Sequence, residues 1–365
     1  MKRAVLVSCF NWYEVRLKYV KEVLENKNYK VDIITSNFNH HLKKNEVKKF
    51  PEIQYINVPK YKKNISISRL FSHYVFAEKV YRSIKDKNYD LIYCIIPPNF
   101  LAYKIKKIYK KNANTAIYFD VIDLWPEAFP IEKFKKNLIF KLWADLRNKN
   151  LNISKCVFIE CNLYCNTLKK YITNDKIYTL YLTSPKKYFD EKIKNANSKI
   201  VFCYLGSINS LIDIDSICII IKKASKIKPV VLNIIGGGIF SEKLINLARN
   251  NGAYVNDYGY VFEDTLKANI LNNSHFGLNL YHSHNIGLTI KSIDYFSAGL
   301  PIINSIKGDT WDFVEKYNLG KNFDGQEICN DFFIYDYNRK NIYEFYLKHF
   351  SIDAFKLNIE KTIEE

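Results

Sequence analysis

The stretch VVLNIIGGG at 230–238 decides the fold class. Its first six residues are almost all apolar, and three glycines end the run directly before a helical pattern at 240–250. A short run rich in Val and Ile predicts a strand of a parallel sheet, buried on both faces. Glycines after such a strand allow either a tight turn or the close approach of a phosphate or sugar. The run is neither GxGxxG nor a P-loop, so dinucleotide binding and Walker-type ATP binding are unsupported.

Strand and helix patterns alternate on both sides of this stretch. Such alternation predicts an α/β protein with parallel sheets covered by helices on both faces. The predicted strands are 3–9, 29–36, 52–58, 91–96, 115–120, 156–161, 199–206, 230–238, 253–259, 275–281 and 300–305. The predicted helices are 13–27, 67–86, 99–111, 135–150, 213–226, 240–250, 291–298 and a tail at 340–365.

A polar segment, TSPKKYFDEKIKNANSK at 183–199, interrupts the alternation, which restarts directly after it. We interpret this segment as a linker, because 365 residues suffice for two domains. The sequence therefore predicts two doubly wound domains, an N-terminal one at 1–182 and a C-terminal one at 200–345.

The net charge of +18 lies in the first half of the chain. Residues 1–182 hold 34 Lys and Arg against 16 Asp and Glu, whereas residues 183–365 hold 21 of each. A basic half indicates a negatively charged partner, either nucleic acid or an anionic membrane surface. A lysine-rich coding bias without any partner is the alternative.

The segment GLTIKSIDYFSAGLPIIN at 287–304 carries the side chains best suited to chemistry. Lys291 and Asp294 are three residues apart on a predicted helix, so they share one face. The helix start offers free N–H groups and a positive dipole end, which suit a diphosphate. Lys291 would add charge against that diphosphate, and Asp294 would accept two ribose hydroxyls. Without the surrounding motif, Lys291 and Asp294 could equally form an ion pair on the protein surface and bind no ligand.

The run KSIDYFSAGLP at 291–301 resembles the donor-site motif of the family 4 retaining glycosyltransferases, which have the GT-B fold. It is similar in particular to the bacterial branch that builds surface polysaccharides such as capsule, O-antigen and exopolysaccharide. In that branch the pattern Lys-x-x-Glu-Tyr-x-Ala-x-Gly-x-Pro is usual. The resemblance also covers YLGSINSLIDIDSI at 204–217, IIGGG at 234–238, NDYGYV at 256–261, HFGLNLY at 275–281 and DVIDLWPEAF at 120–129.

The resemblance implies a GT-B fold, in which two Rossmann-like domains face each other across a cleft. The C-terminal helix at 346–365 would return to the N-terminal domain. A nucleotide sugar would bind mainly to 200–345, and a glycan acceptor, expected to be lipid-linked, would bind mainly to 1–182. Transfer would retain the anomeric configuration and need neither a metal ion nor another cofactor. Catalysis would then depend on positioning and on electrostatic stabilisation of the leaving diphosphate.

The resemblance also assigns roles to individual residues. Lys291 would stabilise the diphosphate, and a carboxylate at Asp123 or Glu127 would orient the acceptor hydroxyl or stabilise positive charge on the sugar ring. The donor-binding residues would be Gly206, Gly236, Gly237, Gly238, Tyr260, Gly287, Leu288, Thr289 and Asp294. The acceptor-side residues would be Asn11, Arg16 and Trp125. Trp125 could instead be a buried core residue that does not contact the acceptor. The loop at 8–16, which contains Asn11 and Arg16, could likewise be only a connection between a strand and a helix.

The sequence departs from the family pattern at the donor site. Ile286 replaces the glutamate that usually stands eight residues before the position of Asp294, and the Arg and Lys that often follow the GS turn are missing from 207–213. These departures keep a non-catalytic binding subunit open as an alternative. A nucleotide-sugar epimerase with the same fold is a second alternative. The basic N-terminal half counts against it, because an epimerase would need no basic surface.

Basic stretches with interleaved aromatic residues occur at 42–63, 104–111 and 133–149. They lack the patterns of known nucleic-acid-binding folds, so we expect no nucleic-acid partner. Lysines for anionic headgroups and aromatics for the interface favour an anionic membrane surface; solvated helix faces are the alternative. The N-terminus does not read as a signal peptide and no stretch reads as a membrane span, so we expect a cytoplasmic protein, peripheral on the inner face of the plasma membrane.

Overall fold

Two parallel sheets organise the chain, one in each of two units. Met1–Tyr181 and Phe355–Glu365 form the N-terminal unit, and Leu182–Ala354 form the C-terminal unit. A computed structural model describes residues 1–40, 42–46, 50–127, 137–191, 198–282, 286–326, 328–334 and 336–364. Parts of several segments named above lie outside the described residues, among them 47–49 and 133–136 of the basic stretches, 128–129 of the run 120–129 and 192–197 of the linker.

The N-terminal unit contains a sheet of seven parallel strands in the order β5-β2-β1-β6-β7-β8-β9. The central strand β6, LIYCII, is buried at every position, because helices cover both faces of the sheet. The strands are β1 Lys2–Ser8, β2 Tyr29–Ser36, β5 Ile53–Ile56, β6 Leu91–Ile96, β7 Ala116–Val121, β8 Cys156–Ile159 and β9 Ile177–Thr179. A short hairpin, β3 Phe38–Asn39 and β4 Lys44–Asn45, lies apart from this sheet.

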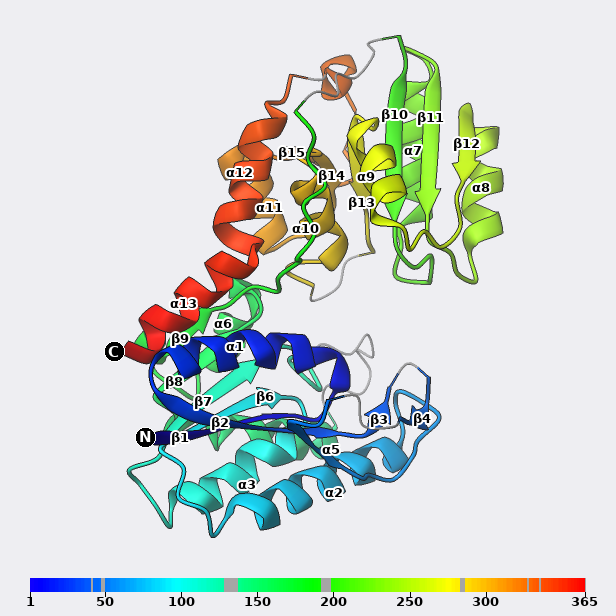
Figure 1. Ribbon diagram of the computed structural model, residues 1–365. Helices are drawn as coiled ribbons and strands as arrows, with labels where there is room; N and C mark the ends of the chain where they lie inside the picture. Colours follow the sequence, from blue (N-terminus) through cyan, green and yellow to red (C-terminus); the bar gives the residue numbers. More distant parts are fainter. Residues whose placement is uncertain are drawn as a thin grey trace. The chain divides into compact units, whose positions relative to one another are not determined.

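Helices cover both faces of this sheet, with α1 on one face and α2 and α3 on the other (Figure 1). Helix α3 also packs against α5, so that α2, α3 and α5 form one layer. The last helix, α13, lies beside α1, where the Phe355 ring meets Tyr19 at 6.1 Å between ring centroids. The helices are α1 Glu14–Asn26, α2 Ile67–Ile84, α3 Asn99–Tyr109, α5 Leu138–Asn148, α6 Cys165–Leu168 and α13 Ile352–Glu364.

The C-terminal unit contains six parallel strands in the order β12-β11-β10-β13-β14-β15. This is the doubly wound order, in which the direction of winding reverses between β10 and β13. The strands are β10 Ile200–Leu205, β11 Val230–Ile235, β12 Ala253–Asp257, β13 Phe276–Asn279, β14 Ile302–Asn304 and β15 Gly320–Asn322. Ligands of such sheets bind beyond the carboxyl ends of the strands at the reversal.

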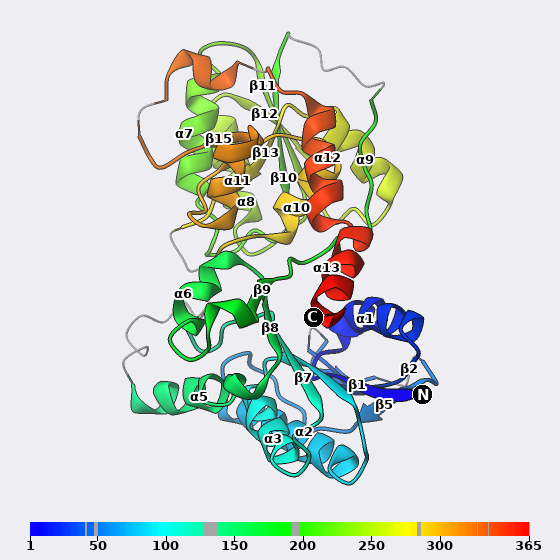
Figure 2. The ribbon, with the colours of Figure 1, turned by 90° about the vertical axis from the view of Figure 1, so that its left-hand side faces the viewer.

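Helices again lie on both faces of this second sheet, with α7 on one side and α9 on the other (Figure 2). They are α7 Ile214–Ala224, α8 Ser241–Asn250, α9 Asp264–Asn272, α10 Ile290–Ser297, α11 Asp309–Tyr317 and α12 Arg339–Phe350. The core beneath α7 consists of aliphatic and aromatic side chains from β10, β11 and β13, among them Phe202, Leu232 and Phe276. The predicted fold class, two doubly wound parallel-sheet domains, is confirmed.

Several short elements were not predicted from the sequence. They are β3, β4, β9, β15, α6, α9 and α11. Strand β15 has the sequence Gly-Lys-Asn and carries no apolar alternation, so only its pairing with β14 identifies it. Helix α9, DTLKANILN, has only a narrow buried stripe at its C-terminal end.

Two glycine loops pack directly on each other at the carboxyl ends of β10 and β11. Gly236 has a φ of +127°, and a Cβ atom there would lie 2.2 Å from the Gly206 carbonyl oxygen. A Cβ atom at Gly238 would lie 2.3 Å from the Ile208 carbonyl oxygen. The Ile208 N–H group in turn donates to the Gly237 carbonyl at 3.0 Å. This contact between loops is what requires glycine at 236 and 238.

A matched pair of alanine substitutions tests this packing. Gly238→Ala should destabilise the C-terminal unit by about 2 kcal/mol, because backbone atoms cannot move aside cheaply. Gly237→Ala should change the free energy of unfolding by less than about 1 kcal/mol, because its Cβ would meet only the Tyr260 ring at 3.3 Å. Urea unfolding followed by circular dichroism measures both. Equal midpoints for the two variants would contradict the assigned loop contact.

Candidate functional site

Lys291 is the central feature of the C-terminal unit. Its side chain is 8% exposed and lies next to Gly206, whose missing Cβ would be 3.7 Å from the lysine Cε. The ammonium donates to the Tyr204 hydroxyl at 3.1 Å and lies 4.2 Å from the Tyr204 ring centroid and 4.8 Å from that of Tyr281. No carboxylate pairs with it among the described residues. Burial therefore lowers the pKa of Lys291 to about 7.

A ladder of asparagine amides fixes the start of the helix that carries Lys291. Asn279, Asn304 and Asn322 end the neighbouring strands β13, β14 and β15 in register. Asn279 donates to Asn304 at 2.9 Å, and Asn304 donates to Asn322 at 2.9 Å. The Thr289 hydroxyl donates to Asn279 Oδ1 at 2.9 Å and accepts the Ser292 N–H bond at 3.2 Å. Thr289 is thus the N-cap of α10, held in place from the sheet edge.

The backbone before α10 is anchored on its other side as well. The Gly287 carbonyl accepts bonds from the Thr310 N–H group at 3.0 Å and from the Thr310 hydroxyl at 2.8 Å. The Leu288 side chain is 5% exposed and belongs to the core. The N–H groups of Ile290 and Lys291 have no acceptor among the described residues. These two donors and the Lys291 ammonium together form a place for an anion.

Tyr260 stands beside the glycine loop of β11. Its ring is 67% exposed and would lie 3.3 Å from a Cβ atom at Gly237. Glycine at 237 therefore leaves room for this ring. An exposed aromatic ring at the carboxyl edge of a doubly wound sheet is suited to stacking on a nucleotide base.

Asp294 does not pair with Lys291. Its Oδ1 atom accepts a hydrogen bond from the Ser184 hydroxyl at 3.1 Å. Burial raises the pKa of Asp294, while nearby Lys267 and Lys186 act against that rise. The surface ion pair considered from the sequence is thus absent, and the two side chains have different surroundings.

In the N-terminal unit, a buried ion pair joins the end of β7 to α1. Arg16 Nε lies 2.7 Å from Asp120 Oδ2, and Tyr93 donates to the same carboxylate at 2.6 Å. The guanidinium also donates to the carbonyls of Leu180 and Tyr181. Arg16 is 7% exposed, and its guanidinium is bonded to three groups: the Asp120 carboxylate and the two carbonyls. The expectation that Arg16 faces the acceptor is therefore corrected to a buried structural position.

Asp123 lies three residues further along and has very different surroundings. It is partly exposed, and its carboxylate has no hydrogen-bond partner among the described residues. Burial raises the pKa of Asp123 to about 6, against an opposing effect of Arg69. A carboxylate with this pKa, unused by its own chain, is suited to orient a hydroxyl or to accept its proton.

Glu127 differs from Asp123 because a buried arginine holds it. Arg147, which is fully buried, donates from Nη2 to Glu127 Oε1 at 2.6 Å, and its Nη1 donates to the Trp125 carbonyl. An arginine bond of this kind fixes the orientation of the carboxylate. Of the two predicted acceptor-side carboxylates, the geometry favours Asp123 as the reactive group.

The remaining acceptor-side residues have structural partners. Asn11 donates to Glu46 at 2.9 Å. Trp125 is 9% exposed and stacks on His73, with 5.9 Å between the ring centroids. Its ring also has the Arg69 guanidinium 4.0 Å from its centroid. The buried-core alternative therefore describes Trp125.

Four residues near these groups were missed from the sequence. Tyr204 and Tyr281 border Lys291, and Arg69 and His73 border Trp125. Arg69 is one of four Lys or Arg residues within the predicted helix 67–86, so the sequence carried no signal that distinguished it. The tyrosines lie inside apolar strand runs and gave none.

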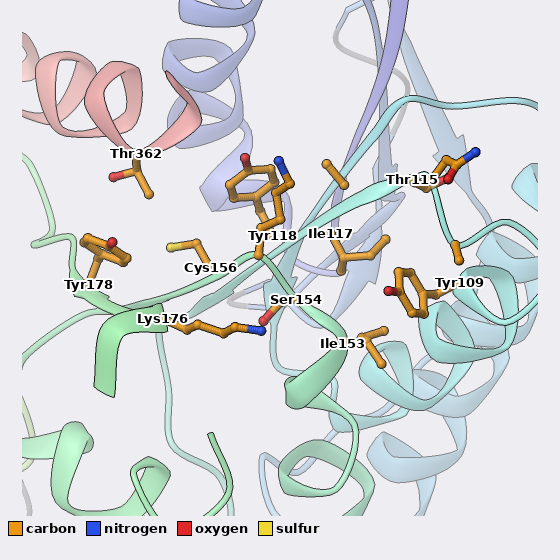
Figure 3. Close-up of a pocket in the computed structure, with 14 residues that line it drawn as sticks. Tyr109, Thr115, Ile117, Tyr118, Ile153, Ser154, Cys156, Lys176, Tyr178 and Thr362 are labelled. Carbon is orange, nitrogen blue, oxygen red and sulfur yellow. The ribbon is translucent and has the colours of Figure 1, made fainter. Parts of the chain in front are cut away.

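A polar cavity of about 380 Å³ opens elsewhere on the N-terminal unit. Figure 3 shows Lys176 directed toward Ser154, and Thr362 reaching the cavity from α13. Residues at the start of β7 and β8 line it, so it lies at the amino-terminal edge of the sheet. Ligands of doubly wound sheets bind at the opposite edge, so we leave this cavity out of the candidate site.

Comparisons with known proteins agree with this fold. No model of a protein family matches the sequence, and no curated protein matches it. Solved structures match over the whole chain, and they include GT-B glycosyltransferases. The chain accordingly has the GT-B fold.

The individual structures are distant in sequence. The sucrose-phosphate synthase of Thermosynechococcus elongatus matches with a TM-score of 0.69 at 14% identity, over 100% of this chain and 98% of that one. The lipopolysaccharide outer core galactosyltransferase WaaB matches with a TM-score of 0.70 at 18% identity, over 100% and 99%. HepE of Anabaena, in complex with UDP and glucose, matches with a TM-score of 0.63 at 12% identity, over 100% of both chains. At such identities the likeness establishes the fold.

The two neighbouring aspartates offer a test of their assigned positions. Asp120→Asn should destabilise the protein by about 3–5 kcal/mol, because it leaves the buried Arg16 without its counter-charge. Asp123→Asn should leave the stability at pH 7.5 unchanged or higher, because a raised pKa means that burial disfavours the ionised form. The urea midpoint and the melting temperature measure both effects. A larger loss for Asp123→Asn than for Asp120→Asn would refute the assignment.

Proposed function

We propose that the protein is a retaining, metal-independent glycosyltransferase similar to family 4. It transfers a sugar from a nucleotide diphosphate sugar to a lipid-linked glycan in the assembly of a bacterial surface polysaccharide. The observation that carries the proposal is Lys291, a buried cation without a counter-charge, at the carboxyl edge of a doubly wound sheet. The GT-B fold and the complex of the Anabaena neighbour with UDP and glucose support it.

The donor half of the reaction follows from the surroundings of Lys291. The diphosphate binds the Lys291 ammonium and the free N–H groups at the start of α10, while Tyr260 stacks on the base and Asp294 holds the ribose. The diphosphate becomes more negative as the bond to the sugar breaks, and a preorganised cation stabilises that change. Because Lys291 supplies this charge, the reaction needs no metal ion.

The acceptor half depends on Asp123. Its carboxylate accepts the hydrogen bond of the attacking hydroxyl and holds it near the sugar carbon. The hydroxyl proton passes to the departing diphosphate. Glu127, held by Arg147, keeps the Trp125–Glu127 segment in shape.

The membrane part of the proposal rests on the basic N-terminal half. No helix within the described ranges is both long and apolar enough to cross a bilayer. A peripheral contact with the inner face of the plasma membrane would bring the enzyme to a lipid-linked acceptor, and the excess of lysine favours an anionic surface.

A non-catalytic binding subunit remains the second candidate, because Ile286 stands where the family has a glutamate. Such a subunit would bind the nucleotide sugar and release no nucleoside diphosphate from it. Turnover on a mixture of sugar nucleotides with a bacterial lipid extract therefore separates the two functions, and product sugars with an inverted hydroxyl would instead show an epimerase.

Binding of the donor tests the role of Lys291. In the absence of metal, one nucleotide diphosphate sugar of a panel should raise the melting temperature by mass action. Lys291→Met should weaken that binding about 100-fold, because a charge-assisted contact is lost, while the free protein stays at least as stable. Lys222→Met, at an exposed position of α7, is the control with unchanged binding.

The same titration has a second readout. Lys291 is mostly deprotonated in the free protein above pH 7, and a bound diphosphate raises its pKa again. Binding at pH 8.5 should therefore take up close to one proton, and the affinity should fall with rising pH. Calorimetry in buffers of different ionisation enthalpy measures the uptake. Binding without proton uptake, or undiminished in Lys291→Met, would exclude Lys291 from the donor site.

The pH dependence of transfer tests Asp123. If the ionised carboxylate is required, kcat/KM should rise through a pKa of about 6 and level off above it. Asp123→Asn should lower kcat about 10²- to 10⁴-fold. Asp123→Glu should restore part of the activity with a shifted acid limb. Full activity of Asp123→Asn would remove Asp123 from the mechanism.

A further inference from the structure

A second cavity of the N-terminal unit, of about 240 Å³, lies next to Trp125. It is situated between the start of α2 and α5, two helices of the layer on one face of the sheet. Its walls are mostly apolar and include Ile67 and Leu70 of α2 and Ile139 and Trp143 of α5. Pockets for whole small ligands measure about 300–1,000 Å³, so this one has room for a segment of a longer apolar molecule.

The mouth of this pocket continues into an exposed apolar surface. Ile67 is 85% exposed, Leu138 is 68% exposed and Ile139 is 67% exposed. Ile65, which also lines the pocket, is more than half exposed. Exposed apolar side chains that line a pocket indicate a site for another molecule, because isolated proteins rarely leave large apolar patches in water.

The inner end of the pocket contains polar side-chain atoms that lack hydrogen-bond partners. His73 is 1% exposed, and neither of its ring nitrogens has a hydrogen-bond partner among the described residues. The Nε atom of Arg69 is also without a partner, although Nη1 of the same side chain donates to the Asn64 carbonyl at 2.6 Å. A buried donor without an acceptor is costly, and a ligand oxygen would remove that cost.

The segment that leads into α2 carries charge of one sign. The chain has no acidic residue between Glu52 and Glu78, a stretch that includes three lysines and Arg69. The Lys43 ammonium donates to the Asn64 side chain at the edge of the pocket and lies close enough to Arg69 for the two charges to repel. A pocket with an apolar mouth, Arg69 at its inner end and Lys43 at its edge is complementary to an anionic amphiphile.

Arg69 also connects the pocket to the proposed acceptor site. Its guanidinium lies over Trp125 and is close enough to Asp123 to influence the pKa of that carboxyl. A molecule whose charged group reached Arg69 would therefore have its next chemical unit near Asp123.

We propose that this pocket holds the first hydrocarbon segment of a lipid phosphate that serves as the acceptor. The phosphate lies at Arg69 and Lys43, the chain leaves the protein between Ile67 and Ile139, and the glycan extends toward Asp123. The proposal rests on the proposed transferase function, since it names where its lipid-linked acceptor binds.

The test uses the whole protein and a prenyl phosphate in neutral detergent micelles as the probe. Trp125 and Trp143 line the pocket, so occupancy should change the intrinsic tryptophan fluorescence. Ile139→Asp, which places a charge at the mouth, should weaken binding at least tenfold. Leu142→Asp is the matched control: it lies on the same helix, is also exposed and does not line the pocket, and binding should stay within twofold.

Other probes separate the alternatives. The prenyl alcohol without phosphate should bind at least tenfold more weakly, and Lys43→Gln should reduce this difference. Equal loss in Ile139→Asp and Leu142→Asp would overturn the pocket in favour of a general apolar surface. Binding of phosphatidylglycerol vesicles that depends on Ile139 as strongly as prenyl phosphate binding would overturn the acceptor assignment in favour of bilayer docking.

The donor assay keeps the two proposals distinguishable. Nucleotide diphosphate sugar binding should be the same in the wild type, Ile139→Asp and Leu142→Asp, because the donor residues belong to the other unit. Donor binding that depends on Lys291, with no binding of prenyl phosphate, would reject the pocket and leave the transferase standing. The absence of donor binding would reject the transferase itself.

Discussion

A lysine amine buried without a counter-charge is the constraint around which the C-terminal unit is arranged. Removing an ammonium from water is costly, so Lys291 must either lose its proton or acquire an anion. The surrounding structure holds the side chain where water does not reach it: two tyrosine rings border it, and the amide ladder fixes Thr289 and with it the first turn of α10. The glycine loops bring the backbone of Gly206 up to the same side chain. The arrangement leaves a buried amine that a bound anion would stabilise in its charged form, in line with the proposed donor site.

The N-terminal unit shows the same physics with the opposite sign of charge. Asp120 lies near the end of β7 and Asp123 follows that strand, but only Asp120 is neutralised, by an arginine 104 residues away in the sequence. That pair spans α1 and β7 and also binds the carbonyls at Leu180 and Tyr181, so it contributes to the fold itself. Asp123 makes no such bond, and burial raises its pKa. A carboxylate that the fold does not need is the one that is left for chemistry.

The sequence predicted the fold well because that information is local. Runs such as IVFCYL at β10 and glycines after β11 identify buried parallel strands without knowledge of their neighbours. The chemistry was harder, because the state of a side chain depends on partners far away in the chain. Arg16 and Glu127 have charges and positions that suit an acceptor site, and only their contacts with Asp120 and Arg147 show that they are already engaged. The polar strand β15 was missed for the same reason, since its pairing and its place in the amide ladder are both long-range.

The uneven distribution of charge along the chain follows from how the two units would bind their ligands. The C-terminal half carries no net charge and places a single desolvated cation at one point, where the low dielectric strengthens its interaction with a diphosphate. The N-terminal half carries the whole excess of +18, mostly on solvated lysines that attract an anionic surface weakly and from many directions. The buried Lys291 would therefore determine which ligand binds, whereas the exposed lysines of the N-terminal half would determine where in the cell the protein is found. Both kinds of charge occur beside Trp125. There the partly buried Arg69 borders an apolar pocket within a basic surface. An amphiphile with one phosphate and one long chain satisfies both at once, which neither a free nucleotide nor an uncharged glycan can do.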